Sequence, residues 1–340
     1  KATMEAKTSL LDDLMTRVDH LKQHLPALNS PFAIRELMLN SDDPKVITGS
    51  ADKGIAEPGK YPLEILQLAN GASALSNGLP DKDQTQVGTG YVTFTTFDGD
   101  QQEIFIDSDN STLESIAKTI NQSKVGVRAN VITDSSDPDN PYKLLVSTQH
   151  IGETADVNFP EFYFTGGEED FFVDTQRDAT NALVRYQGFE IQSPTNEIKD
   201  LIPGATLNIK GMTDLGKPTT VSIEQDVPKT TTKMRDLVDK INQVLSFIQA
   251  QNKMDDKTDT SKTLGGEYSM LLAENKLRRA LQQNYILDDN RSIRSLSDLG
   301  IAFNKTGTLI FDEKKFQHAL ETNFDATVDF MAGDGTSYGI

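Results

Sequence analysis

The stretch LDDLMTRVDHLKQHLPAL, residues 11–28, decides how this chain is organised. Its apolar residues recur at alternating spacings of three and four, with charged and hydroxyl side chains between them. A seam this narrow is typical of a helix that packs against one partner helix rather than inside a broad core. The apolar residues of this first seam are Leu11, Leu14, Val18, Leu21, Leu25 and Leu28.

A second seam with the same spacing lies far along the chain and supplies the partner. It is formed by Met234, Leu237, Ile241, Val244 or Leu245, and Ile248. We predict that the two seams pack as a discontinuous, antiparallel, coiled-coil-like leg, so that the residues between them form an insertion. Packing within one chain is the simpler interpretation, and contacts between chains in an assembly are the alternative.

Length and composition limit the classes of protein to consider. A chain of 340 residues is long enough for two or three domains. Its 51 acidic and 33 basic residues give a formal net charge of -18, which makes nucleic acid and anionic membranes unfavourable partners. The sequence contains 0 cysteines, which excludes disulfides, thiolate zinc sites and cysteine catalysis. No apolar run is long enough to predict a membrane span.

The insertion has the patterns of small β-rich domains. Residues 91–150 read as a β-β-α-β-β block, in which Asp98-Gly99-Asp100 is a hairpin turn signal. Ser111 and Glu114 are spaced as a capping box at the start of its helix. Before the insertion, Ser30 and Pro31 predict the cap of a short helix that continues to about Leu39.

These patterns predict an α+β multidomain fold, in which a helical leg carries an inserted β-rich head of two small domains. Residues 1–68 and 227–340 would form the helical leg domain with a β-hairpin. Residues 69–178 would form a head domain around the β-β-α-β-β block. Residues 179–226 would form a smaller β head domain, to which residues 69–90 could contribute strands.

Two patterns resemble metal sites but lack essential parts. His20 and His24 have the spacing of a helical zinc pair, yet no glutamate follows the first histidine and no third ligand is evident. The acidic loop with Asp134, Asp137 and Asp139 lacks the central glycine and terminal glutamate of an EF-hand. We therefore predict no catalytic residues, no metal and no cofactor, and the leg seam is the only set of candidate site residues.

Four stretches, in order along nearly the whole chain, resemble one known family. They are Glu57–Leu63 with Leu68-Ala69, Ile106–Asn121, Asn181–Leu207, and Leu296–Asp312. Together with helical seams outside and β units inside, they resemble the flagellar filament-capping proteins, the FliD or hook-associated protein 2 family. The abrupt ends at Lys1 and Ile340 are those expected of a piece truncated at both termini.

The resemblance implies a structural, non-enzymatic role in the bacterial flagellum. Such a protein is exported by the flagellar type III apparatus without a cleaved signal peptide and acts outside the cell at the filament tip. There it forms a ring-like homo-oligomer of about four to six subunits and guides flagellin into the filament. Hook-associated junction proteins and an export chaperone on the missing terminus would be further partners.

Two other roles are open on the sequence alone. A hook–filament junction protein or a flagellin-like subunit would share the plan of a helical leg with a β insert. The head could also serve cell adhesion by binding host glycans.

Overall fold

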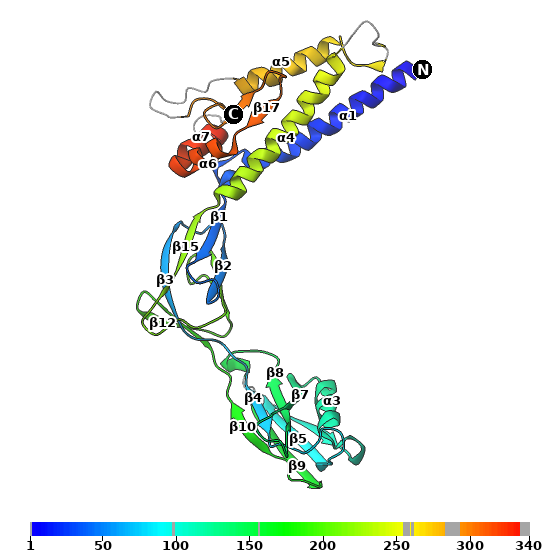
Figure 1. Cartoon of the computed structure of the whole chain (residues 1–340), viewed down its shortest axis with the longest axis vertical. Coiled ribbons are helices and arrows are strands. Elements are labelled where there is room, and N and C mark those ends of the chain that lie inside the picture. The colour runs from blue at the N-terminus through cyan, green and yellow to red at the C-terminus, as the bar shows by residue number, and fades with distance from the viewer. Residues whose placement is uncertain are drawn as a thin grey trace. The chain divides into compact units, whose positions relative to one another are not determined.

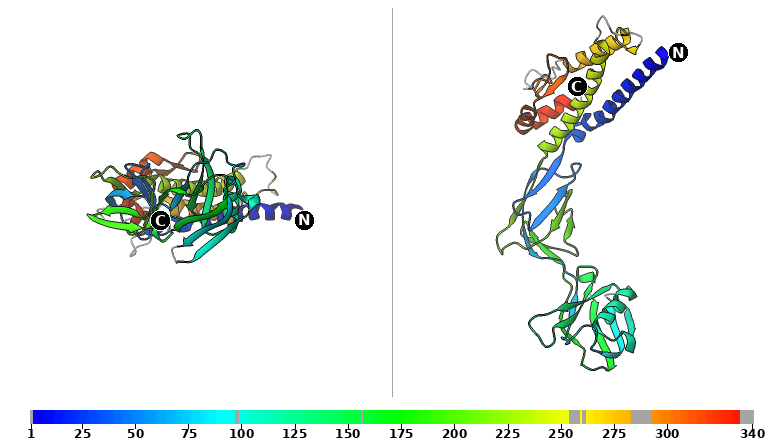
Figure 2. Two further views of the ribbon diagram at one scale, coloured as in Figure 1. Left: turned by 90° about the horizontal axis from the view of Figure 1, so that it is seen from below. Right: turned by 45° about the vertical axis from the view of Figure 1, so that its right-hand side comes forward.

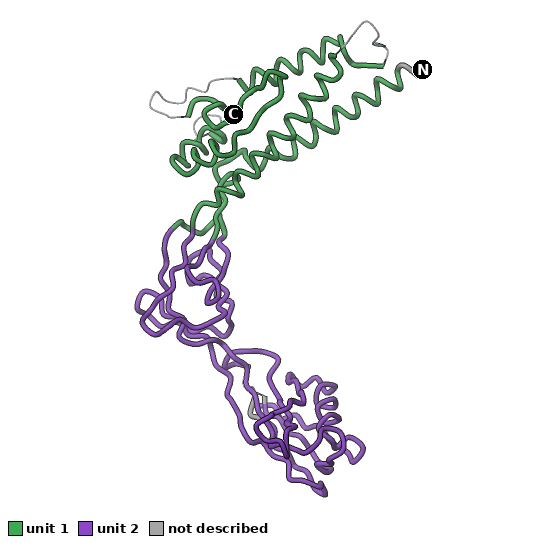
Figure 3. Tube along the Cα trace, viewed as in Figure 1, with its two compact units in different colours: residues 1–38, 52–58, 224–340 green, residues 39–51, 59–223 purple. Residues whose placement is uncertain are grey.

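Two compact units make up the protein, and the chain passes between them more than once (Figure 3). Unit 1 comprises residues 1–38, 52–58 and 224–340, and unit 2 comprises residues 39–51 and 59–223. Most helices belong to unit 1 and the larger antiparallel sheets to unit 2, which confirms the predicted α+β multidomain class. The computed structural model describes residues 2–96, 99–155, 157–253, 259, 262–282 and 293–333.

Two long antiparallel helices, α1 (Ala2–His24) and α4 (Val227–Asn252), form the frame of unit 1 (Figures 1 and 2). Leu14 packs in a cluster with Phe247 near the end of α4, whereas Leu28, just after α1, packs with Met234 near its start. Asp226 caps α4 by accepting a hydrogen bond from the Lys229 backbone N–H at 2.9 Å. The two predicted seams therefore face each other in the antiparallel direction.

The remaining elements of unit 1 pack on this helix pair and share its largest core, which includes Leu245, Phe316 and Phe330. These elements are η1 (Leu25–Leu28, a 3₁₀ turn), α2 (Pro31–Ile34), α5 (Tyr268–Gln282), β16 (Ile301–Phe303), β17 (Leu309–Phe311), α6 (Glu313–Thr322) and α7 (Phe324–Ala332).

None of the helices in the described ranges is both long enough and apolar enough to cross a membrane.

Asn242 on α4 holds the β16–β17 hairpin through both groups of its amide. Its Oδ1 accepts a hydrogen bond from the Leu309 backbone N–H at 2.7 Å, and its Nδ2 donates to the Leu309 carbonyl at 2.9 Å. The Asn242 side chain therefore satisfies both the backbone N–H and the backbone carbonyl of Leu309, and it attaches the hairpin to α4.

Asn242→Asp is expected to destabilise unit 1 by roughly 1–3 kcal/mol, because it removes the donor and places a carboxylate oxygen against the Leu309 carbonyl. Chemical denaturation followed by circular dichroism measures the change. Asn275→Asp on the exposed face of α5 is the matched control and should leave the unfolding midpoint in place. An equal loss in both variants would contradict this role for Asn242.

The first part of unit 2 contains a five-stranded and a three-stranded antiparallel sheet. The larger sheet has the order β1-β15-β3-β11-β12, and the smaller has the order β13-β14-β2. The strands are β1 (Leu37–Ser41), β2 (Ile47–Ala51), β3 (Gly59–Gln67), β11 (Ala182–Tyr186), β12 (Phe189–Ser193), β13 (Glu197–Lys199), β14 (Ala205–Ile209) and β15 (Thr219–Gln225).

The second part of unit 2 contains two further sheets and one helix around a single core. Helix α3 (Leu113–Ser123) packs its apolar face against β7 (Figure 1). The sheets have the orders β10-β4-β8-β7 and β6-β5-β9. Their elements are β4 (Ser73–Ser76), β5 (Gly88–Thr96), β6 (Gln101–Ile106), η2 (Ser108–Asn110), β7 (Val127–Thr133), β8 (Tyr142–Thr148), η3 (Glu153–Ala155), β9 (Val157–Gly166) and β10 (Val173–Arg177).

Two local predictions need correction. The short helix after Ser30 begins as predicted, with the Ser30 hydroxyl accepting from the Ala33 N–H, but it ends at Ile34. The next residues form β1 because β15 supplies the hydrogen-bonding partner that the local sequence does not reveal. The capping box at the start of α3 is formed by Thr112 and Ser115, one position later than the predicted pair.

The strand pairing also differs from the predicted domain division. Strands β1, β2 and β3, which the prediction included in the leg, bond to β15, β14 and β11. Short strands need such partners because an isolated hairpin is marginally stable in water. We propose that unit 2 holds two domains, one from the strands of 37–67 and 182–225, and one spanning 73–177.

Candidate interaction surfaces

The structure places the seam residues of α4 in the core of unit 1. Leu237 is partly buried, and the other four are buried: Met234, Ile241, Leu245 and Ile248. On α1, Leu14, Val18 and Leu21 are partly buried and pack against the clusters that contain these residues. The arrangement provides packing within the chain and no reactive group.

Leu11 and Leu25 lie outside this packed seam, with 46% and 48% of their surface exposed. Leu10, which the seam pattern omitted, takes the packed position one residue before Leu11. A straight helix turns through 3.6 residues per turn, so a strict heptad repeat drifts around its surface over several turns. This drift explains the exposure of Leu11, whereas Leu25 follows the end of α1 at His24 and lies in η1. The predicted first seam is corrected at both of these positions.

An exposed apolar strip runs along α1, formed by Met4, Leu11 and Met15. Residues four and seven positions apart lie on one helical face, so these three side chains point to the same side of α1. Met15 was missed because it does not fit the seam spacing. Large apolar side chains gathered on one face of a helix are typical of a contact surface for another protein.

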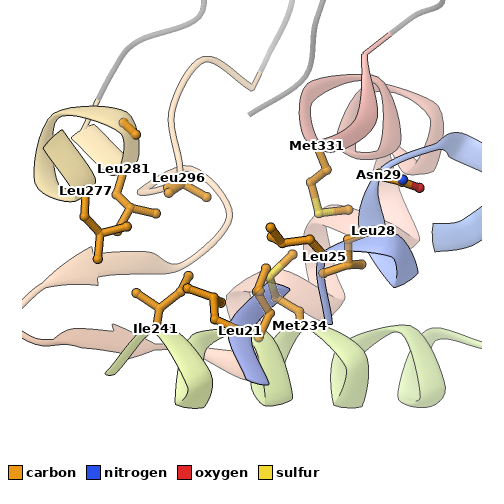
Figure 4. A pocket seen from close by; sticks show the side chains of 12 residues that line it. Leu21, Leu25, Leu28, Asn29, Met234, Ile241, Leu277, Leu281, Leu296 and Met331 are labelled. Atoms are coloured by element: carbon orange, nitrogen blue, oxygen red, sulfur yellow. The ribbon is translucent and has the colours of Figure 1, made fainter. Parts of the chain in front are cut away.

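An apolar cavity of about 390 Å³ lies between α1, α4, α5 and α7 in unit 1 (Figure 4). The half-exposed side chain of Leu25 forms part of its wall. Because nearly all of the side chains that line it are apolar, the cavity can receive apolar side chains and offers almost no polar groups for a charged ligand. Its lining residues are Leu21, Leu25, Leu28, Asn29, Met234, Leu237, Ile241, Leu277, Ala280, Leu281, Leu296 and Met331.

A buried carboxylate joins the start of α4 to the segment before β1. Glu36, with 7% of its surface exposed, pairs with Lys229 at 2.8 Å, with Lys53 at 2.9 Å, and with Lys233. Burial alone would raise the pKa of Glu36, but hydrogen bonds from the three lysines outweigh it and hold the pKa at about 2. Lys53 and Lys233 also donate to the Ala33 carbonyl, so the cluster ties three chain segments together.

The structure explains the incomplete metal patterns by ordinary hydrogen bonding. The His24 Nδ1 lies 2.8 Å from the backbone oxygen of His20, one helical turn earlier. Asp134 accepts hydrogen bonds from Ser136 and pairs with Lys143 at 2.9 Å. The hydrogen bond from the Ser136 hydroxyl is the main reason that the pKa of Asp134 is lowered. In the ranges that the structure describes, no three His, Cys, Asp or Glu side chains gather where they could hold a metal ion.

Fold and surfaces together define the class as a multidomain α+β protein, with a helical unit that presents an apolar strip and an apolar cavity. Comparison with known proteins then identifies the family. Residues 179–340 match the description "flagellar hook-associated protein 2 C-terminus". The B-type flagellar hook-associated protein 2 of Pseudomonas aeruginosa is 25% identical over 361 residues, covering 98% of this chain and 74% of the relative.

Two solved structures are also similar. The flagellar cap protein FliD from Bdellovibrio bacteriovorus is 42% identical, with a TM-score of 0.49, covering 54% of this chain and 99% of that one. The D1-D2-D3 domains of the flagellar cap protein FliD from Escherichia coli have a TM-score of 0.64 at 21% identity. That match covers 97% of this chain and 92% of the other, and it shows the shared fold. The chain belongs to the flagellar hook-associated protein 2 family, which is a family of structural proteins of the flagellum.

Proposed function

We propose that this protein caps the flagellar filament from outside the cell and promotes the folding and incorporation of flagellin subunits. Membership of the hook-associated protein 2 family supports this role. The observation that connects this role with particular residues is that unit 1 has both an exposed apolar strip, formed by Met4, Leu11 and Met15, and an apolar cavity. A subunit that only had to fold would gain nothing from exposing these side chains to water.

In this proposal the helical unit contacts flagellar subunits and unit 2 makes the contacts between copies of the cap protein. The strip and the cavity provide apolar surface for a helix with apolar side chains on one face, a common mode of recognition. Assembly needs no catalytic chemistry, so the role is non-enzymatic. Delivery through the flagellar export apparatus, an export chaperone and contacts with the hook-associated junction proteins belong to the same proposal.

A deletion strain tests the cap role. Loss of the full-length gene is expected to abolish swimming and to release unpolymerised flagellin into the medium, and complementation should restore both. The mass of the purified protein should increase with concentration toward a closed oligomer. Filaments of normal length in the deletion strain would contradict the cap role.

The double variant Leu11→Ser, Met15→Ser tests the helical strip. Burying a large apolar side chain contributes about 1.5–3 kcal/mol, so losing two should weaken the contact roughly hundredfold or more. Swimming should be lost while thermal unfolding changes little, because Leu11 and Met15 are 46% and 62% exposed.

Asp12→Ser, an exposed position on the same helix, is the matched control and should retain swimming. Full swimming by the double variant would remove the strip from the contact surface.

A further inference from the structure

The three-stranded sheet β6-β5-β9 in unit 2 has two faces of different character. Its inner face packs Val92 and Phe94 into the core with α3. On its outer face, Tyr91 stands directly opposite Phe105 on one neighbouring strand and Tyr163 on the other. The rings of Tyr91 and Phe105 lie 5.2 Å apart, and all three residues are about half exposed. We call Phe105, Tyr91 and Tyr163 the aromatic row.

Two carboxylates flank the aromatic row on the same outer face. Thr93, two residues after Tyr91, lies opposite Glu103 on β6 and Glu161 on β9. Both glutamates are exposed, and within the described ranges neither forms an ion pair. Because residues two apart on a strand share a face, the row and the two acids form one patch that is apolar with a negative edge.

A second exposed feature of unit 2 has a small net positive charge, because it contains Lys210 and Lys217 and one acid, Asp214, which pairs with Lys217 at 3.0 Å. Leu215 is 84% exposed at the tip of a turn between β14 and β15, which is closed by a hydrogen bond from the Lys217 N–H to the Asp214 carbonyl at 3.0 Å. Gly216 in this turn has a φ of 75°, the left-handed conformation that the third position of a type II turn requires. Polar residues are usual in turns, so a leucine at the tip exposes apolar surface at a cost.

The stem of this turn is fixed to β3 by two hydrogen bonds. The Thr213 hydroxyl accepts a hydrogen bond from the Ile65 N–H at 3.1 Å, and the Thr213 N–H donates to the Ile65 carbonyl at 3.0 Å. Lys210 and Lys217 lie on either side of Leu215 in sequence, and both are exposed. We call residues 210–217, which also include the exposed Met212, the leucine turn.

We propose that the aromatic row of one copy of this protein binds the leucine turn of a second copy. The two patches are complementary in charge, because Glu103 and Glu161 flank the row, whereas Lys210 and Lys217 outweigh Asp214 in the turn and give it a net charge of +1. Both patches are apolar at the centre and charged at the rim, as specific protein interfaces are. The inference rests on the proposed function and names the surface through which copies of the cap protein associate.

A second copy fits these observations better than a foreign ligand because one chain carries both halves. Each subunit would use two different patches, which makes the contact heterologous, or head-to-tail. Such a contact leaves one patch free at each end of a pair, and it closes into a ring when the rotation per subunit permits. In such a ring, each subunit contacts one neighbour through its aromatic row and the other neighbour through its leucine turn.

Cysteine cross-linking of the full chain tests this contact directly, because the sequence contains 0 cysteines. Tyr91→Cys protein mixed with Leu215→Cys protein should form disulfide-linked dimers under mild oxidation. Each variant alone should form few. Mixing Tyr91→Cys with Ile55→Cys, a side chain that is 62% exposed in unit 1, provides the background yield. A mixed dimer yield no higher than that background overturns the inference.

Charge reversal provides a second arm, read out as the dissociation constant for self-association in analytical ultracentrifugation. Glu103→Lys with Glu161→Lys should weaken association at least about tenfold, and adding Lys210→Glu with Lys217→Glu should restore it. All four positions are exposed, so folding is expected to be unchanged. Restoration by the second pair distinguishes a direct contact from damage to the sheet.

The possible outcomes separate this inference from the cap role itself. If the wild-type gene restores swimming but the protein stays monomeric at every concentration, the inference is overturned and the cap role stands. Failure of the wild-type gene to restore swimming counts against the cap role. If Tyr91→Ala abolishes binding to a glycan array but leaves self-association intact, the aromatic row is a glycan site and the inference is wrong.

Discussion

A Glu36→Gln variant is expected to unfold with a free energy about 3 kcal/mol below that of the wild type at neutral pH. The pKa of Glu36 falls from 4.5 to about 2 in the folded state, and each pKa unit corresponds to about 1.36 kcal/mol. Glutamine preserves the shape but leaves three lysine ammonium groups, those of Lys53, Lys229 and Lys233, around a neutral side chain. Chemical denaturation followed by circular dichroism, which reports mainly on the helices of unit 1, measures the loss.

The pH dependence gives this prediction a second readout. A carboxyl group whose pKa is lowered by folding binds fewer protons in the folded state than in the unfolded state. Its stabilising contribution is complete above pH 4.5 and disappears as the pH falls from there toward about 2. The difference between wild type and Glu36→Gln should therefore shrink across that window. A difference that stays constant down to about pH 2 would show that the carboxylate charge is not its cause.

Glu267→Gln is the matched control for this experiment. Glu267 also pairs with a lysine, Lys7, at 2.8 Å, but its side chain is 49% exposed. Water and salt screen such a pair, so its loss should hardly change the unfolding midpoint. If both variants lost similar stability, the burial of Glu36 would not be the reason for its effect.

The helical unit was largely predictable because its signals are local and periodic. The antiparallel pairing of α1 and α4 follows from two seams with one spacing. The exact packed positions were less predictable, since a shift of one residue exchanges Leu10 for Leu11 without changing the composition. Periodicity identifies the helical face, whereas the partner's surface decides which residue at its edge is buried.

The β unit was predictable strand by strand but not in its pairing. The helix at 113–123 follows from short local motifs, whereas the predicted turn at 98–100 begins outside the described residues. Nothing near β1 or β3 indicates that their partners lie more than a hundred residues away in β15 and β11. Register across such distances depends on which faces are buried after folding, and the local sequence does not contain that information.

The candidate surfaces could not be predicted from the local sequence either. Leu215 is visible in the sequence as an apolar residue beside glycine, but its 84% exposure depends on the turn that presents it. Tyr91, Phe105 and Tyr163 form a row only because three strands align them. Alternation along a strand predicts that one face is apolar, and it does not predict that aromatic residues on the other face lie side by side.

Leu245→Ala is expected to destabilise unit 1 by about 3 kcal/mol or more, whereas Leu11→Ala should change its stability by less than about 0.5 kcal/mol. The two variants remove the same atoms from the two predicted seams, but Leu245 is 0% exposed and Leu11 is 46% exposed. Truncating Leu245 leaves a cavity in the packed core of unit 1, whereas water fills the space that the Leu11 side chain leaves at the surface. Denaturation of both proteins under one condition measures the difference. If Leu11→Ala proved as costly as Leu245→Ala, Leu11 would have to lie inside the helical interface, and the apolar strip on α1 would lose its central residue.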